Sequence, residues 1–457
     1  MDNYQVLGLR DIIGLCLYVL IYTIIRKYIQ RIIGSEFNLF ERALFAWLIG
    51  NILFFLLFYF YYGWGDTFNY YAFGMQLLYF IIDYPSTLFD IYFSSEILQL
   101  PFISYSYFSF MPNLGLLSNH ANFFVTKIIA TGLFFTLGSY LTLSFVFTIA
   151  SFIGCWLIYS VFRSLYLPLK TYLYYSILYL PNIIFWGNGI SKEAIYLSGL
   201  GILFYNFYHF FIAQDKNWQR IIYILIGSYI VYSVKSYVFF CFFPTLIFWY
   251  FLKFFYNSTY SLNAKVLTFF VMLISISLLS LFVDVNNIAK DFTLNSILEN
   301  ALGYGNLVYD LSETTDGSSY TLSEFEPTLT GVINVIPEAL STALFRPYIW
   351  EIKKPINLFN AMEGILLMII IIYLLIKIGF LNSIKYTLKS PDILFCFLFS
   401  FIFLFGVSLS SFNFGALVRY KLPGELFFII GLCILYYVGY LKPKLNEKNN
   451  IIYYHEE

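Results

Sequence analysis

Long apolar runs alternate with short polar connections along nearly the whole 457-residue chain. A helix needs roughly 20 mostly apolar residues to cross a bilayer. Runs of this kind predict spans at 11–30, 43–62, 140–162, 171–187, 193–213, 220–234, 237–254, 264–284, 358–380, 391–411 and 421–441. Three of them, 171–187, 220–234 and 237–254, are short, which indicates tilted or broken helices. Stretch 122–138 carries Lys127 and precedes a stronger run, so we expect an interfacial or re-entrant helix there.

Composition supports this interpretation. Hydrophobic residues make up 60% of the chain and charged residues 11%, whereas a soluble domain carries about 25% charged residues. Such a chain cannot cover a water-facing surface, but it can face lipid. The sequence therefore predicts an all-α fold, a polytopic transmembrane helix bundle of about eleven spans in one integral membrane domain, 1–457.

The charges are distributed unevenly between alternate connections. Basic residues gather at one set, namely Arg26, Lys27, Arg31, Arg42, Arg163, Lys170, Lys216, Arg220, Lys253, Lys265, Lys377, Lys385, Lys389, Lys442, Lys444 and Lys448. The positive-inside rule makes that face cytoplasmic. It places the N-terminus outside and the C-terminus in the cytoplasm, as expected for a multi-pass protein of a bacterial inner membrane. The total charge is zero, so nothing draws the chain to nucleic acid.

Two long connections lie on the opposite, outer face. The first is 63–121, which with the interfacial helix forms an outer region at 63–138, and the second is 285–357. Both are rich in acids. Connections longer than about 15 residues are uncommon unless they are functional or disordered. These loops are therefore where we look for function.

Asp66 follows the second span within Gly63-Trp64-Gly65-Asp66-Thr67. A carboxylate at this level, with its pKa raised by burial, would suit removal of a proton from a sugar hydroxyl. The alternative is a solvated acid that caps the next helix.

Two lysines lie in unusual surroundings. Lys192 and Glu193 follow a Gly-Asn-Gly turn, and Ser191 is placed to cap the helix behind it. A lysine at a helix start opposes the helix dipole, so either a phosphate or Glu193 would neutralise it. Lys235 interrupts an apolar run, which indicates either function or snorkelling to the interface.

Three further cations lie near the ends of late outer connections. Arg346, in Phe345-Arg346-Pro347-Tyr348-Ile349-Trp350-Glu351, offers a planar fork suited to phosphate, beside aromatic rings suited to sugars. Its alternative is an ion pair with Glu351. Arg419 and Lys421 break the positive-inside pattern, so they bind either an anionic headgroup or the acidic loops.

Other chemistry finds little support. The five cysteines lie in apolar runs and are expected to be small core residues, and the three histidines are isolated. Zinc spacings and nucleotide-binding motifs are absent from the sequence. No cofactor is therefore assigned, although a carboxylate-bound divalent cation stays open.

The chain resembles bacterial polytopic enzymes of surface-polysaccharide assembly, the GT-C-type glycosyltransferases and the O-antigen-polymerase-like proteins. The resemblance rests on four segments: Gly-Asp-x-x-x-Tyr at 65–70, Gly-x-Ser-Lys-Glu at 189–193, Phe-Arg-Pro…Trp-Glu at 345–351, and Arg-Tyr-Lys at 419–421. In GT-C enzymes the acid usually follows the first span. Its place after the second span here implies an extra N-terminal helix.

The resemblance implies a membrane glycosyltransferase or polymerase that uses a polyprenyl-phosphate-linked sugar, with other polysaccharide-assembly proteins as partners. Asp66 would act as base or metal ligand. The phosphates would bind Lys192, Lys235, Arg346, Arg419 and Lys421; the sugar would bind Tyr70, Trp186 and Trp350; and Glu193 and Glu351 would support them. The alternative is a non-enzymatic transporter or flippase for a polysaccharide or lipid-linked sugar.

Overall fold

The computed structural model describes residues 8–63, 65–94, 119–256, 303, 306, 319–323, 329–352 and 356–445. These residues are almost entirely helical, as predicted, and Ser319 and Asn413 form an isolated antiparallel bridge. The chain divides into two compact units. Unit 1 comprises Met1–Val161, Leu178–Phe210 and Lys216–Phe239, and unit 2 comprises Phe162–Ile177, Phe211–Asp215 and Phe240–Glu457. Each unit is described by itself.

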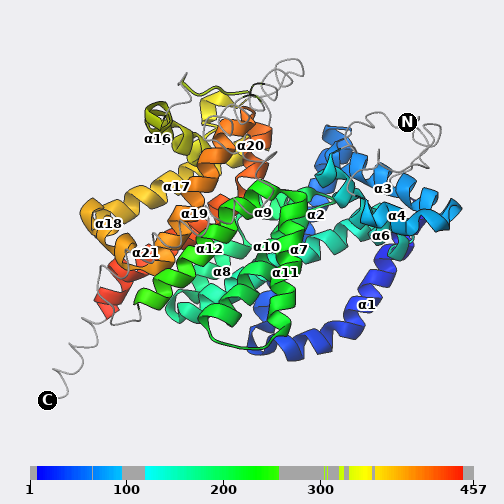
Figure 1. Cartoon of the computed structure of the whole chain (residues 1–457), viewed down its shortest axis with the longest axis horizontal. Helices are drawn as coiled ribbons and strands as arrows, with labels where there is room; N and C mark the ends of the chain where they lie inside the picture. Colours follow the sequence, from blue (N-terminus) through cyan, green and yellow to red (C-terminus); the bar gives the residue numbers. More distant parts are fainter. Residues whose placement is uncertain are drawn as a thin grey trace, which may run out of the picture. The chain divides into compact units, whose positions relative to one another are not determined.

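Figure 1 labels the helices of both units. The helices that lie wholly or mainly in unit 1 are α1 Leu9–Ile33, α2 Phe37–Leu56, α3 Asp66–Asp83, α4 Leu88–Phe93, α6 His120–Phe135, α7 Tyr140–Leu165, α9 Pro181–Trp186, α10 Lys192–Phe207 and α11 Gln219–Val234. Those wholly or mainly in unit 2 are α8 Lys170–Leu178, α12 Ser236–Tyr256, α16 Leu329–Phe345, α17 Ile356–Ile378, α18 Phe380–Lys389, α19 Pro391–Ser411, α20 Phe414–Tyr420 and α21 Leu422–Tyr436.

Seven helical stretches within the described ranges are long and apolar enough to cross a membrane. This confirms the membrane character of the chain but not the predicted count of eleven spans. Helices α1 and α2 form one apolar stretch, and α11 is a shorter helix. Pro181 begins α9 and Leu180 is extended, so the predicted span 171–187 is broken. Span 264–284 lies outside the described residues, and the sidedness of the chain stays a prediction.

Within its described residues, the region 63–138 contains helices that pack together. Helices α3, α4 and α6 bury a cluster of apolar side chains, formed by Phe73, Leu77, Phe80, Ile91, Phe123 and Ala130. Tyr70 of α3 adds a hydrogen bond from its hydroxyl to Asn122 Oδ1 of α6, 2.8 Å long. Three phenylalanines of this region, Phe73, Phe80 and Phe123, thus belong to a small core. Lys127, on the predicted interfacial helix, donates to the carbonyl oxygen of Ser94 at 2.8 Å.

Glycines bring helices of unit 1 close together. A β-carbon added at Gly201 of α10 would overlap the backbone of Gly154 in α7, and one at Gly227 of α11 would meet the backbone of Leu203 in α10. Without side chains at these positions, the backbones approach closely, as small residues allow in membrane helices. Helices α10 and α11 run antiparallel, side by side (Figure 1).

Replacing Gly201 with alanine should therefore destabilise the protein by about 1–3 kcal/mol, the usual cost of overpacking. The matched control is Gly406→Ala in α19, where an added β-carbon meets no atom within 4 Å. That control should unfold within about 1 kcal/mol of the wild type, since alanine favours a helix over glycine by about that amount. Thermal unfolding in detergent measures both; equal melting temperatures for the two variants would contradict the close contact.

Candidate functional site

The predicted site residues are divided between the two units. Unit 1 holds Asp66, Tyr70, Trp186, Lys192, Glu193 and Lys235. Unit 2 holds Arg346, Trp350, Glu351, Arg419 and Lys421.

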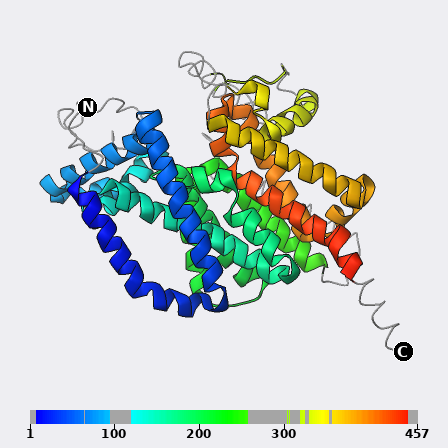
Figure 2. The ribbon, with the colours of Figure 1, turned by 180° about the vertical axis from the view of Figure 1, so that it is seen from behind.

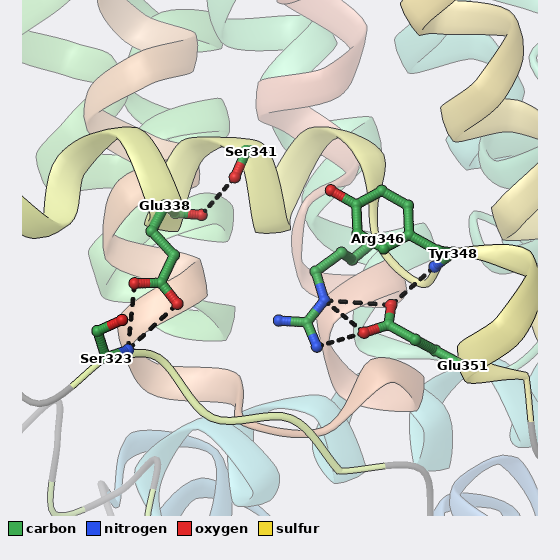
Figure 3. A network of polar contacts seen from close by, with 6 residues as sticks. All are labelled: Ser323, Glu338, Ser341, Arg346, Tyr348 and Glu351. Carbon is green, nitrogen blue, oxygen red and sulfur yellow. Dashed lines mark hydrogen bonds and ion pairs between the residues drawn. The ribbon is translucent and has the colours of Figure 1, made fainter.

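Arg346 and Glu351 of unit 2 form a clamped ion pair, the alternative that the sequence left open. Figure 3 shows the guanidinium facing the carboxylate. Nε donates to both carboxylate oxygens at 2.9 and 3.1 Å, and Nη2 donates to Oε1 at 2.5 Å. The backbone N–H of Tyr348 also donates to Glu351, at 2.8 Å. Arg346 is therefore held in one orientation, with only about a fifth of its side chain exposed.

One nitrogen of this guanidinium is available for a ligand. Nη1 makes no hydrogen bond within the part of the chain that the structure describes, and in Figure 3 it points away from Glu351. Beyond it, Glu338 of α16 accepts two hydrogen bonds from the backbone N–H of Ser323, at 3.2 and 3.1 Å. An arginine has five N–H donors, so Arg346 can bind an anionic oxygen through Nη1 without leaving Glu351.

Two aromatic rings that the sequence analysis missed lie beside Arg346. The guanidinium carbon lies 5.4 Å from the ring centre of Tyr320 and 5.3 Å from that of Phe414, within cation–π range. Tyr320 is positioned by its N–H, which donates to the carbonyl of Phe412, and by its hydroxyl, which donates to that of Ser408. Burial raises the pKa of Tyr320, so its hydroxyl stays protonated. No local sequence signal connects Tyr320 with Phe414, because they are far apart in the sequence and meet beside the bridge between Ser319 and Asn413.

Trp350 is the exposed part of this arrangement. Its side chain is 81% exposed, and its ring stacks on Tyr348 with centres 4.9 Å apart. A preformed aromatic stack presents a flat apolar face at little entropic cost. An exposed ring surface at Trp350 and a clamped cation at Arg346 therefore lie four residues apart in the sequence.

Arg419 and Lys421 are engaged elsewhere in unit 2. The Lys421 ammonium pairs with Glu425 at 3.2 Å, and both side chains are only 1% exposed. Arg419 donates from Nε to the carbonyl of Gly415 at 3.2 Å. The alternative prediction is that acidic loops neutralise this lysine. Lys421 does pair with an acid, but that acid is Glu425, one helical turn away. Phosphate binding by Lys421 stays a prediction and requires this pair to open.

Glu193 and Lys235 form a buried ion pair in unit 1. The ammonium lies 2.8 Å from Glu193 Oε1, with side chains 7% and 8% exposed. It also lies 4.9 Å from the ring centre of Tyr196. Lys235 therefore does not snorkel to the interface. Lys235 is the C-cap residue that follows α11, and Glu193 lies in the first turn of α10, where a carboxylate suits the helix dipole.

The turn before α10 agrees with its sequence. Gly189 has φ +72°, a conformation that glycine adopts without strain. The Ser191 hydroxyl accepts the N–H of Ala194 at 3.1 Å, which confirms the predicted cap. Lys192 is the first residue of α10 and is partly exposed.

Asp66 is the first residue of α3 and is exposed. The predicted burial of Asp66 is therefore not found. Its position in the first turn suits the dipole of α3, close to the alternative interpretation of a helix-capping acid. The residue that precedes the helix is Gly65.

Trp186 is a core residue, 6% exposed. Its ring lies 6.4 Å from those of Phe54 and Phe58 and 5.0 Å from that of Phe185. A sugar contact by Trp186 stays a prediction and requires this cluster to open. Tyr70 is half-buried, and its hydroxyl donates a hydrogen bond to Asn122.

The described ranges contain no group of three or more histidine, cysteine, aspartate or glutamate residues placed to hold a metal ion. All five cysteines are free thiols, and Cys16 is exposed while the other four are buried or partly buried. Comparisons with protein-family models, with curated proteins and with solved structures find no match to this chain.

Proposed function

We propose that the chain is a membrane glycosyltransferase or polymerase that uses a polyprenyl-phosphate-linked sugar or oligosaccharide in cell-surface polysaccharide assembly. The supporting observation is the arrangement around Arg346. A clamped guanidinium with Nη1 available is followed four residues later by an exposed tryptophan that stacks on Tyr348. Phosphate oxygens are recognised by such a planar fork, and a sugar ring packs on an aromatic face. A lipid-linked sugar carries both groups.

The reaction forms one bond and breaks another. An acceptor hydroxyl oxygen attacks the anomeric carbon, the bond from that carbon to the phosphate oxygen breaks, and the polyprenyl phosphate leaves with the electron pair. Arg346 stabilises the negative charge that grows on the leaving oxygen. The proton of the acceptor hydroxyl passes to a base, the role predicted for Asp66, which is exposed.

The other four predicted cations differ in whether they must first leave an acid before they can bind phosphate. Lys192 and Arg419 are proposed as secondary phosphate ligands. Lys235 and Lys421 are committed to acids in the described conformation, so they act only if the carboxylates of Glu193 and Glu425 are released. Releasing the carboxylate would leave the buried ammonium without a counter-ion, which is destabilising. A doubly charged phosphate could take the place of the carboxylate as that counter-ion.

The test replaces Arg346 with glutamine in the purified full chain reconstituted in liposomes. Loss of a charge-assisted hydrogen bond of about 1.5–3 kcal/mol should lower transfer from a polyprenyl-phosphate-linked sugar about 10- to 100-fold. Product is measured by chromatography of the released sugar chain. The matched control is Lys385→Gln, which removes an exposed cation of α18 in the same unit and should transfer normally.

Melting temperatures of both variants are compared with the wild type, so that loss of transfer is separated from loss of fold. A folded Arg346→Gln protein with wild-type turnover would exclude Arg346 from the site. A wild-type protein that forms no glycosidic bond from any polyprenyl-linked donor would overturn the proposed enzyme class.

A second candidate function is favoured by the Glu193–Lys235 pair. Ionisable residues buried among apolar helices mark ion or substrate pathways in transporters. A flippase for lipid-linked sugars would move a fluorescent polyprenyl-linked sugar across liposomes without forming a new bond. Translocation without product favours the flippase, whereas product without translocation favours the transferase.

A further inference from the structure

Helix α1 of unit 1 makes polar contacts near both of its ends, and between them the ring of Tyr18 stacks on that of Phe145, with centres 5.8 Å apart. Near its start, Asp11 accepts hydrogen bonds from the Ser139 hydroxyl (2.8 Å) and the Leu141 N–H (3.1 Å). Near its end, Arg26 pairs with Glu41 of α2 at 2.5 Å, and the Tyr22 hydroxyl donates to the same carboxylate at 2.9 Å. Figure 2 shows α1 and α2 as two arms that diverge from their turn at Gly34–Glu36.

Between these attachments lies a groove of about 490 Å³. Its walls come from α1 and α2 and are mainly apolar, formed by Tyr18, Val19, Tyr22, Glu41, Arg42, Leu44, Phe45 and Leu48. Val19 and Phe45 are 58% and 65% exposed. A space of several hundred cubic ångströms is of the size that holds a small ligand. Because its apolar walls are exposed, a ligand with an apolar part would gain free energy by covering them.

The charge at the turn end of the groove is positive. Glu41 is already neutralised by Arg26, whereas Arg42, beside it, is exposed and lines the groove. Lys27 and Arg31 are exposed on the same end of α1. An apolar channel that ends in cations complements an amphiphile with an acyl chain and an anionic headgroup. Basic pockets between membrane helices bind anionic lipid headgroups in this way.

We propose that the α1–α2 groove binds one anionic phospholipid, with an acyl chain against Val19, Phe45 and Leu48 and its phosphate at Arg42. The lipid is a structural ligand that fills the space between the two helices. It is distinct from the proposed donor substrate, and the site is independent of Arg346.

The test measures lipid binding to the purified, delipidated full chain by native mass spectrometry, with phosphatidylglycerol and phosphatidylcholine as probes. Arg42→Gln should weaken phosphatidylglycerol binding about fivefold, the effect of one cation near a phosphate, and leave phosphatidylcholine unchanged. Val19→Trp fills the groove and should remove the tightest site for both lipids. Glycerol 3-phosphate, which has no chain, should not displace phosphatidylglycerol.

Two matched controls accompany these variants. Lys385→Gln removes an exposed cation and Leu381→Trp adds a ring at a position that is 79% exposed, both on α18. Both should bind lipid as the wild type does. The proposal is overturned if Arg42→Gln keeps wild-type affinity for phosphatidylglycerol, if Val19→Trp behaves like Leu381→Trp, or if glycerol 3-phosphate competes.

Discussion

Replacing Lys235 with methionine should lower the free energy of unfolding by about 3–5 kcal/mol, because it leaves the Glu193 carboxylate buried without its counter-ion. The ammonium and the carboxylate are 2.8 Å apart and more than nine-tenths buried, so water cannot take over the missing contact. Glu193→Gln should lower the free energy of unfolding by a similar amount, because it leaves the Lys235 ammonium buried without its counter-ion. Chemical unfolding of the purified protein in detergent measures both.

The double variant Glu193→Gln/Lys235→Met carries the decisive comparison. Without either charge, most of the lost stability should return, since replacing both partners of a buried pair is often close to neutral. Lys385→Met, an exposed lysine of α18, is the control for the substitution itself and should unfold as the wild type does. Additive losses in the double variant would mean that the two charges do not interact.

Replacing Asp392 with alanine should also cost about 3–5 kcal/mol, since it removes the acceptor of three donors in unit 2, one of them charged. The carboxylate accepts hydrogen bonds from Trp249 Nε1 at 2.7 Å, from Lys253 Nζ at 2.9 Å and from the Tyr166 hydroxyl at 2.5 Å. Asp392 is 3% exposed. Unfolding in detergent should show the loss, and the midpoint for Asp90→Ala, which removes an exposed acid of α4, should not change.

The conservative variants of this cluster sharpen the prediction. Asp392→Asn keeps the shape but presents an N–H₂ group to donors, so it should recover only part of the stability. Tyr166→Phe removes one donor, and burial together with the negative charge of Asp392 raises the pKa of Tyr166, so that hydroxyl is a donor at neutral pH. Its loss should cost about 1–2 kcal/mol. An Asp392→Ala protein as stable as Tyr166→Phe would show that the cluster does not act together.

The helices could be predicted from the sequence because the length of an apolar run and the residues that interrupt a helix are local features. The break within 171–187 follows from Pro181, and the start of α10 follows from Gly189 and Ser191. The Arg346–Glu351 pair was also within reach, since its partners are five residues apart.

Contacts made across helices could not be read in this way. Lys235 and Glu193 are 42 residues apart and meet because α10 and α11 are antiparallel. Asp392 was missed, although Trp249 and Lys253 are four residues apart and therefore share a helix face. The sequence did contain a signal for this cluster. Asp392 is a single acid at the start of one apolar run, and Trp249 and Lys253 share a helix face in another.

The Asp392 cluster also sets an order of assembly during synthesis. A ribosome releases Tyr166 first, then Trp249 and Lys253, and Asp392 only after more than a hundred further residues. Chains fold from the N-terminus as they emerge, so the three donors are synthesised before the carboxylate that joins them. Synthesis of α19 thus completes the Asp392 cluster, and a nascent chain halted before Pro391 holds a lysine and a tryptophan that have not yet met their acceptor.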